Sequence, residues 1–286
     1  MATAPRTLTT IDHDRSAAGL TYVYPVVSRR ARGLSVGINL NTNSACNWRC
    51  IYCQVPGLVR GAAPAVEFKQ LEQELRAFLA EVVHGDFLQR AVPAGMQRLN
   101  DVALSGNGEP TSAREFDRVV ETVGRVMREV PVPPETKLVL ITNGSLMHRA
   151  AVQRGLVRMR ELNGEVWFKL DSATRAGLER INHTGMGPAR LRANLEIAAR
   201  LCPTWIQTSV FLLDGEPPSA ADRAAYLDFL ADMLRTGVPL KGILLYSLAR
   251  PSMQPEAPRL APVSDAWGQR FADEIRRLGL AVEWNP

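Results

Sequence analysis

The amino-acid sequence predicts an α/β fold built on parallel strands, either an open sheet or a barrel. Apolar segments of strand length alternate six times with segments whose apolar residues recur every three or four positions. The strand segments are apolar almost throughout, as strands covered on both faces are. Because a helical segment separates each strand from the next, the strands are expected to run parallel.

The expected strands are short and evenly spaced along the 286 residues. In chain order they are LSVGINLN (34–41), LNDVALS (99–105), KLVLIT (137–142), EVWFKLD (165–171), WIQTSVFLL (205–213) and GILLYSL (242–248). An irregular, basic start precedes the first strand, and a short AVEW segment (281–284) closes the chain.

A helix is expected after each strand, with one apolar stripe facing the sheet. The first stripe is Phe68, Leu71, Leu75, Phe78, Leu79 and Val82, and the second is Phe116, Val119, Val120, Val123 and Met127. Residues 145–162 and the arginine-rich 186–200 are expected to be the next two helices. The last two stripes are Tyr226, Phe229, Leu230, Met233 and Leu234, then Trp267, Phe271, Ile275 and Leu278.

Composition is that of an ordinary globular protein, with 46% hydrophobic and 22% charged residues. No run approaches the roughly 18 apolar residues that span a bilayer, and the first twenty residues lack the apolar core of a secretory signal. We therefore expect a cytoplasmic protein without a membrane partner. Thiols stay reduced in that compartment, so clustered cysteines are expected to bind metal or to react.

Positive charge is concentrated near the N-terminus, although the net charge is only +5. The first 62 residues contain two acids, Asp12 and Asp14, and seven arginines at positions 6, 15, 29, 30, 32, 49 and 60. Such a patch could meet RNA phosphates, or the carboxylate or phosphate of a cofactor or substrate. It could equally be a solvated face with a few buried ion pairs.

Polar residues gather where each expected strand ends. In order they are the cysteine cluster, SGNGEPT (105–111), TNGS (142–145), Lys169 with Asp171 and Ser172, Gln207 with Ser209, and the segment 246–250. The carboxyl ends of parallel strands form the ligand-binding edge of α/β proteins. We therefore expect the functional site at this edge.

Three of the four cysteines, Cys46, Cys50 and Cys53, stand in the spacing C-x3-C-x2-C. A structural zinc ion would need a fourth ligand, from Cys202 or a histidine, and usually a second close pair, which the sequence lacks. Cys202 precedes Pro203 and is expected to be a small buried apolar residue. Three thiolates suit a [4Fe–4S] cluster in which one iron stays open to a ligand.

These motifs resemble those of the radical S-adenosylmethionine (SAM) superfamily. CNWRCIYC is similar to its cluster signature, and SGNGEP to its glycine-rich motif, with Asn107 in place of the usual glycine. YVYPVVSRRARGLSVGINL, CIYCQVPG, ITNGSL and FKLDSAT together resemble the branch of wyosine-forming tRNA synthases and their uncharacterised bacterial relatives. The resemblance covers residues 22–250. It implies an α/β fold with a partial (βα)6 TIM-like barrel (34–250), an N-terminal extension (1–33), and a C-terminal helix and closing strand (251–286).

The resemblance also implies the cofactors and the site. Cys46, Cys50 and Cys53 would hold one [4Fe–4S] cluster, which binds SAM and cleaves it reductively to a 5′-deoxyadenosyl radical that abstracts hydrogen from substrate. The residues expected around SAM are Tyr52, Gly106, Asn107, Gly108, Glu109, Asn143, Lys169, Asp171, Ser172, Gln207, Ser209 and Leu248. Lys169 and His183 are the catalytic candidates.

Several of these residues have a plainer alternative. Glu109 could stabilise the start of a helix, and Asn143 could serve an Asn-Gly turn. Tyr52 could be an ordinary core tyrosine, and His183 a solvated loop residue. Lys169 is the exception, because a lysine in an apolar strand is costly unless it is paired or belongs to a site.

For partners, the resemblance implies an electron donor such as flavodoxin or ferredoxin, and tRNA as a candidate substrate. Archaeal wyosine synthases carry further cluster cysteines, whereas no cysteine precedes Cys46 here, so wyosine formation itself is not expected. A peptide, a glycyl-radical partner or a small metabolite is the alternative substrate. A different class of function is a non-catalytic zinc-binding module that recognises RNA through its arginines.

Overall fold

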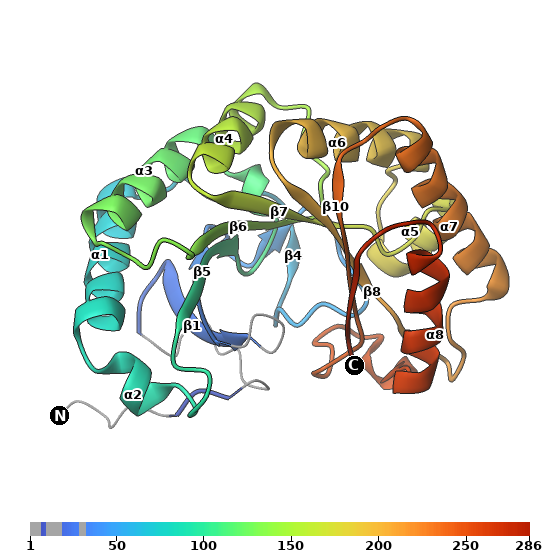
Figure 1. Ribbon diagram of the computed structural model, residues 1–286, viewed down its shortest axis with the longest axis horizontal. Coiled ribbons are helices and arrows are strands. Elements are labelled where there is room, and N and C mark those ends of the chain that lie inside the picture. The colour runs from blue at the N-terminus through green and yellow to red at the C-terminus, as the bar shows by residue number, and fades with distance from the viewer. Residues whose placement is uncertain (1–6, 10–18, 29–32) are drawn as a thin grey trace.

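The computed structural model describes residues 7–9, 19–28 and 33–286, and Figure 1 shows a sheet curled into a half barrel with helices on its outer face. This confirms the predicted α/β partial barrel. The arginines at positions 6, 15, 29, 30 and 32, on which the expected basic patch largely depends, lie outside the described residues.

The main sheet has eight strands in the order β1-β2-β5-β6-β7-β8-β10-β12. They are β1 (Val23–Ser28), β2 (Gly33–Asn39), β5 (Leu99–Ser105), β6 (Lys137–Thr142), β7 (Gly164–Lys169), β8 (Thr204–Ser209), β10 (Leu240–Tyr246) and β12 (Val282–Asn285). All neighbours are parallel except β1 and β2. The six strands from β2 to β10 are those expected from the sequence.

The helices pack their apolar stripes on the convex side of the sheet, where the main hydrophobic core lies. They are α1 (Phe68–His84), α2 (Phe87–Ala91), α3 (Phe116–Glu129), α4 (Ala150–Glu161), α5 (Arg175–Asn182), α6 (Pro188–Leu201), α7 (Ala220–Arg235) and α8 (Asp265–Arg276), with single 3-10 turns η1 (Pro110–Ser112) and η2 (Ala257–Arg259). None of these helices is long and apolar enough to cross a membrane.

Two strands extend the sheet beyond the expected six. β12 pairs with β10 and contains most of the AVEW segment. β1 was not expected, because proline is unusual inside a strand. Pro25 is tolerated there since β1 is an edge strand of the sheet.

Two expected elements have different limits in the structure, and one helix was not expected. The strand expected over 205–213 ends at Ser209, and β9 (Phe211–Leu213) pairs instead with β11 (Leu260–Pro262). The break falls at Val210, whose amide donates to the carbonyl of Tyr246. The helix expected over 145–162 begins only at Ala150, because residues 145–148 form a turn and Arg149 a bend. α5 was missed because its eight residues are too few for a clear apolar period.

Strand register decides which side chains face the concave side. Lys169 lies opposite Gln207 on β8. Two residues earlier on the two strands, Trp167 lies opposite Trp205. Since side chains alternate along a strand, Trp167 and Lys169 share one face. Lys169 and Gln207 lie at the carboxyl edge of the sheet, beside the cysteines.

Candidate cofactor-binding site

One cavity of about 320 Å³ collects most of the expected site residues. It is lined by Cys46, Cys50, Cys53, Tyr52, residues 106–109, Asn143, Lys169, Gln207 and Leu248, among others. The structure thus brings together the carboxyl ends of β2, β5, β6, β7, β8 and β10. Asp171, Ser172 and Ser209 instead line a second cavity of about 230 Å³.

The cysteine loop starts from a short pair of strands, β3 (Ala45–Cys46) and β4 (Val59–Arg60). All three cysteine residues are half-buried. Burial is the main cause that raises the pKa of Cys46 and of Cys50 to about 12. Without a metal, these two thiols are protonated at neutral pH, so metal binding must displace their protons.

Three cysteines line the cavity together, and three thiolates are the donor set of a [4Fe–4S] cluster with one open iron. Within residues 7–9, 19–28 and 33–286, no three Cys, His, Asp or Glu side chains converge as ligands of one ion. A [4Fe–4S] cluster binds each thiolate through a different iron, so its ligands need to stand apart on one wall. Two of the sulfurs also accept hydrogen bonds, Cys46 from the amide of Trp48 (3.5 Å) and Cys50 from Asn182 (3.2 Å). Such bonds are typical of cluster thiolates.

The fourth cysteine is separate from this site. Cys202 is 1% exposed, and its sulfur lies 3.5 Å from the carbonyl oxygen of Gly164. It packs in the main core, as expected for a small apolar residue.

The glycine-rich loop packs directly on the cysteine loop. Gly106 has φ of +117°, and a Cβ there would lie 2.5 Å from Asn39 Oδ1. A Cβ on Gly108 would lie 2.1 Å from the carbonyl oxygen of Ala45, the residue before Cys46. Both glycines are therefore required by close approach to the chain's own backbone and side chains.

Glu109 organises this loop from inside the protein. It is 2% exposed, and one carboxylate oxygen accepts from the amide of Thr111 (3.0 Å) and the hydroxyl of Thr142 (2.6 Å). The other oxygen accepts from the amide of Asn143 at 2.7 Å. Burial raises the pKa of Glu109, against the effect of these hydrogen bonds. The carboxylate caps η1 and joins the loop to the end of β6.

Both the nitrogen and the oxygen of the Asn143 side-chain amide form hydrogen bonds within the protein. Its Nδ2 donates to Asn47 Oδ1 at 2.8 Å, and its Oδ1 accepts from the amide of Ser145 at 3.0 Å. Because Asn47 lies between the first two cysteines, this turn fixes the cysteine loop to the end of β6.

Lys169 presents a cation to the cavity next to the cysteines. Its Nζ donates to Tyr246 Oη at 2.9 Å and lies 4.9 Å from the ring centre of Tyr52. Burial alone would lower the pKa of Lys169, but Tyr246, Asp171 and Cys50 outweigh it, so the pKa is raised. The ammonium is therefore charged at neutral pH and suited to an anionic ligand group.

Asp171 lies outside the larger cavity and accepts hydrogen bonds from residues that surround it. It accepts from the hydroxyl of Tyr52, from Asn182 Nδ2 (2.8 Å) and from the amide of Ser209 (3.0 Å). Its carboxylate thus links the cysteine loop to the ends of β7, β8 and α5, and does not line the larger cavity.

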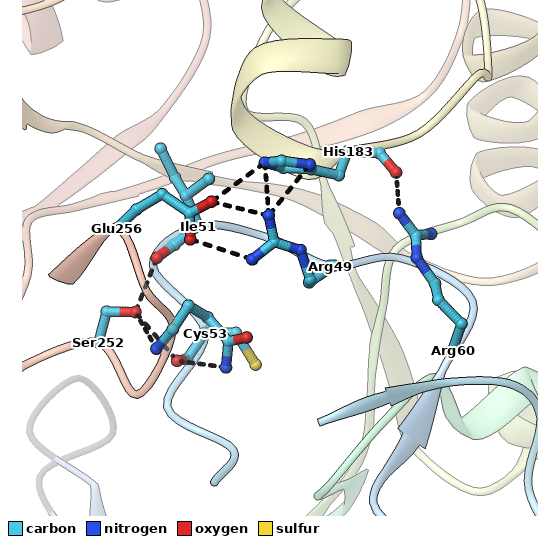
Figure 2. Close-up of polar contacts among 8 residues, drawn as sticks. Arg49, Ile51, Cys53, Arg60, His183, Ser252 and Glu256 are labelled. Carbon is cyan, nitrogen blue, oxygen red and sulfur yellow. Dashed lines mark hydrogen bonds and ion pairs between the residues drawn. The ribbon is translucent and has the colours of Figure 1, made fainter. Parts of the chain in front are cut away.

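His183 lies on the outer side of the cysteine loop (Figure 2). It ends α5 in a left-handed conformation, with φ of 47°. Its ring contacts Arg49 and lies 3.6 Å from a carboxylate oxygen of Glu256, while its carbonyl accepts from Arg60. Burial and the neighbouring Arg49 lower the pKa of His183. It lines neither cavity.

Sequence reasoning missed the segment 252–256, here called the C-terminal strap, which holds the cysteine loop (Figure 2). Ser252 Oγ donates to the carbonyl of Ile51 at 2.7 Å, and the amide of Met253 donates to that of Cys53 at 2.9 Å. Glu256 forms a two-pronged ion pair with Arg49, at 2.7 and 3.0 Å. The strap lies about 200 residues from the loop in sequence, so no local pattern could have revealed it.

Asn182 was missed as well. It is fully buried and donates to both Cys50 and Asp171. The only feature of the sequence that pointed to Asn182 was its position next to His183, which had been named as a catalytic candidate.

No family model matches the chain. The UPF0026 protein of Synechocystis is 26% identical over 161 residues, which are 56% of this chain and 52% of that protein. The chain thus spans about half the length of this curated relative.

Solved structures resemble the chain in fold at low sequence identity. TYW1 with a lysine–pyruvate adduct bound has a TM-score of 0.53 and 14% identity, over 85% of this chain and 73% of that one. A spore photoproduct lyase mutant with AdoMet and dinucleoside spore photoproduct bound has a TM-score of 0.52 and 11% identity, over 84% and 73%. The chain therefore has the partial-barrel fold of radical SAM enzymes and resembles that superfamily in its cysteine motif.

Proposed function

We propose that this protein is a radical SAM enzyme with one [4Fe–4S] cluster held by Cys46, Cys50 and Cys53. The observation that carries the proposal is that these thiols, the glycine-rich loop and the charged Lys169 all line one cavity at the carboxyl edge of the sheet. When bound, the cluster and SAM supply reductive cleavage of SAM to a 5′-deoxyadenosyl radical, which abstracts hydrogen from substrate.

The chain's own residues bind and orient the cofactor. The Lys169 ammonium would attract the carboxylate of the methionine part of SAM. Residues 106–108 offer backbone groups to the same part, and Gln207 and Leu248 line the remaining wall. Asp171, Asn182 and the C-terminal strap hold the cysteine loop in position from outside the cavity.

We propose an RNA base as the substrate group, with a peptide or small metabolite as the alternative. Trp167 lines the same cavity on the concave face below Lys169, and aromatic side chains are surfaces on which bases stack. The spore photoproduct lyase described above, which is similar in fold, holds a dinucleoside.

Anaerobic reconstitution tests the proposal. We expect close to four irons per chain, a brown iron–sulfur spectrum, and release of methionine and 5′-deoxyadenosine from SAM with dithionite. Cys46→Ala, Cys50→Ala and Cys53→Ala should each lose the cluster, and the matched control Cys202→Ala should keep it. A colourless protein that binds zinc would contradict the proposal and favour the zinc-binding module.

A further inference from the structure

Trp167 and Trp205 occupy neighbouring positions on the concave face of the sheet, yet they are placed differently. The two residues are partners in the register of β7 and β8, and both are half-buried. Trp167 lines the cavity that contains the cysteines, whereas Trp205 lines neither of the two cavities described above. The contacts of the two indoles explain this difference.

Trp205 is covered by residues of the next strand, β10. A Cβ on Gly242 would lie 2.6 Å from Cζ3 of Trp205, so the indole lies across that glycine. The Nζ of Lys241 lies 5.2 Å from the centre of the same ring. Trp205 is therefore packed within the protein and turned toward β10.

The Trp167 indole is held by the carboxylate of Glu165, two residues earlier on the same face of β7. Glu165 is 8% exposed, and its Oε1 accepts from Nε1 of Trp167 at 2.9 Å. Its Oε2 accepts from Nζ of Lys241, also at 2.9 Å. A buried carboxylate in an apolar strand is costly unless it is paired, and here the lysine supplies the opposite charge. Both oxygens of Glu165 are thus committed to fixed donors.

This hydrogen bond decides what Trp167 can offer to a ligand. An indole has a single N–H donor, and here that donor is directed to Glu165. Trp167 therefore meets a ligand through its ring surface and not through a hydrogen bond. Lys169 stands two residues further on, roughly 7 Å along the strand. A flat group packed against Trp167 would lie next to the part of the cavity assigned to SAM.

We propose that Glu165 is a positioning residue for the substrate, which fixes the indole of Trp167 as a flat wall for a nucleobase. The inference rests on the proposed function, because this wall serves the substrate of the radical reaction. Glu165 itself does not line the cavity, so it acts through Trp167. The wall selects a planar group by stacking and does not read the pattern of hydrogen bonds on its edge.

Fluorine NMR of the reconstituted protein tests the positioning. The chain has five tryptophans, and 5-fluorotryptophan labels all of them, so that Trp167→Phe identifies the resonance of Trp167. Glu165→Leu should shift or broaden this resonance, because the indole loses its acceptor. Glu165→Gln keeps an acceptor oxygen and should restore the resonance. Glu121→Leu, at an exposed position on α3, is the matched control and should leave the spectrum unchanged.

Calorimetric titration tests the nucleobase. The probes are guanosine and cytidine 5′-monophosphates, with SAM present and no reductant, and ribose 5-phosphate is the ligand without a base. The nucleotides should bind more tightly than ribose 5-phosphate. Their affinity should fall roughly tenfold or more in Trp167→Leu and roughly threefold to tenfold in Glu165→Leu. Trp205→Leu, the matched control, should bind them as the unmodified protein does.

The proposal requires both results. A Trp167 resonance that is unchanged in Glu165→Leu would overturn it, and so would unchanged nucleotide affinity in that variant. Equal affinity of the unmodified protein for the nucleotides and for ribose 5-phosphate would also overturn it, because no base would then be recognised. Neither measurement depends on SAM cleavage. Failure of the unmodified protein to cleave SAM with dithionite would therefore contradict the proposed function separately.

Discussion

The amide nitrogen of Asn182 lies 3.2 Å from the sulfur of Cys50 and donates a hydrogen bond to it. The same nitrogen donates to Asp171 at 2.8 Å, which in turn accepts from the hydroxyl of Tyr52. Asn182, the last residue of α5, therefore contacts Cys50 directly through its side chain. It is linked to Tyr52 indirectly, through the carboxylate of Asp171. Hydrogen bonds to cluster sulfurs tune the reduction potential of the cluster.

We expect Asn182→Leu to lower the reduction potential of the bound cluster, because a donor that stabilises negative charge on Cys50 is lost. A redox titration followed by paramagnetic resonance measures this shift. The stability cost should be modest, since the Oδ1 atom of Asn182 is buried without a partner and its removal offsets part of the loss.

Asn194 provides the control for that experiment. It is equally buried and donates to the carbonyl oxygens of Gly144 and Ser145, not to a thiol. Asn194→Leu should therefore destabilise the protein without moving the potential. Equal potentials in the unmodified protein and Asn182→Leu would show that this hydrogen bond does not act on the cluster.

We expect Gly108→Ala to impair cluster assembly as well as SAM binding. The added Cβ meets the carbonyl of Ala45 at 2.1 Å, so the backbone leading into Cys46 must move. Overpacking of this kind costs about 1–3 kcal/mol of stability. Iron analysis after reconstitution, together with thermal unfolding, measures both effects.

Gly185→Ala is the matched control for Gly108, because a Cβ there meets nothing within 4 Å. It should leave iron content and stability unchanged. Normal iron content with weakened SAM binding in Gly108→Ala would instead mean that the loop meets the cofactor and that its packing on the cysteine loop can relax.

We expect Lys169→Met to keep the cluster and to weaken SAM binding by roughly tenfold to a hundredfold, the range for losing a hydrogen bond to a charged group. Methionine preserves the apolar length of the side chain and removes the charge. SAM affinity, measured by titrating the reconstituted protein, checks this. Lys241→Met, which breaks a pair with Glu165 at 2.9 Å, is the control and should leave the affinity unchanged.

The ion pair between Arg49 and Glu256 predicts how stability depends on pH. The hydrogen bond from Arg49 lowers the pKa of Glu256 below its ordinary value of 4.5. A carboxylate with a depressed pKa stabilises the folded state fully above that ordinary value, and this contribution is lost as the pH falls through the folded pKa. Glu256→Gln should therefore lower the melting temperature of the metal-free protein at pH 7, with a stability loss of about 1 kcal/mol or less.

The difference in melting temperature between the unmodified protein and Glu256→Gln should be constant above about pH 5 and should vanish under more acid conditions. Thermal unfolding at a series of pH values measures it. A difference that persists unchanged in acid would show that the pair is not the source of the stabilisation.

The parts of the fold that could be predicted are those that local patterns determine. Strands such as β6 are continuous apolar runs, and helices such as α3 have a clear apolar stripe. β1 could not be predicted, since Pro25 is compatible with a strand only at a sheet edge, and edges are set by topology. The break after Ser209 likewise depends on long-range pairing, because Phe211–Leu213 pair with β11 and not with the main sheet.

The candidate site shows the same division. The cysteines, the glycine-rich loop and Lys169 were predicted because each lies at or just after the end of a strand and carries a recognisable residue type. The supporting contacts were not, since Asn182, Ser252 and Glu256 are ordinary residue types in ordinary sequence. Only the folded chain brings them to the cysteine loop.

The distance in sequence between the cysteine loop and its strap has a consequence for biosynthesis. Arg49 and Glu256 are 207 residues apart, so the cysteines emerge from the ribosome long before the segment that holds them is synthesised. During that interval the loop lacks the bonds to Ile51 and Cys53, and iron delivered early would meet thiols in an unfinished setting. Stable loading of metal is therefore expected to follow translation.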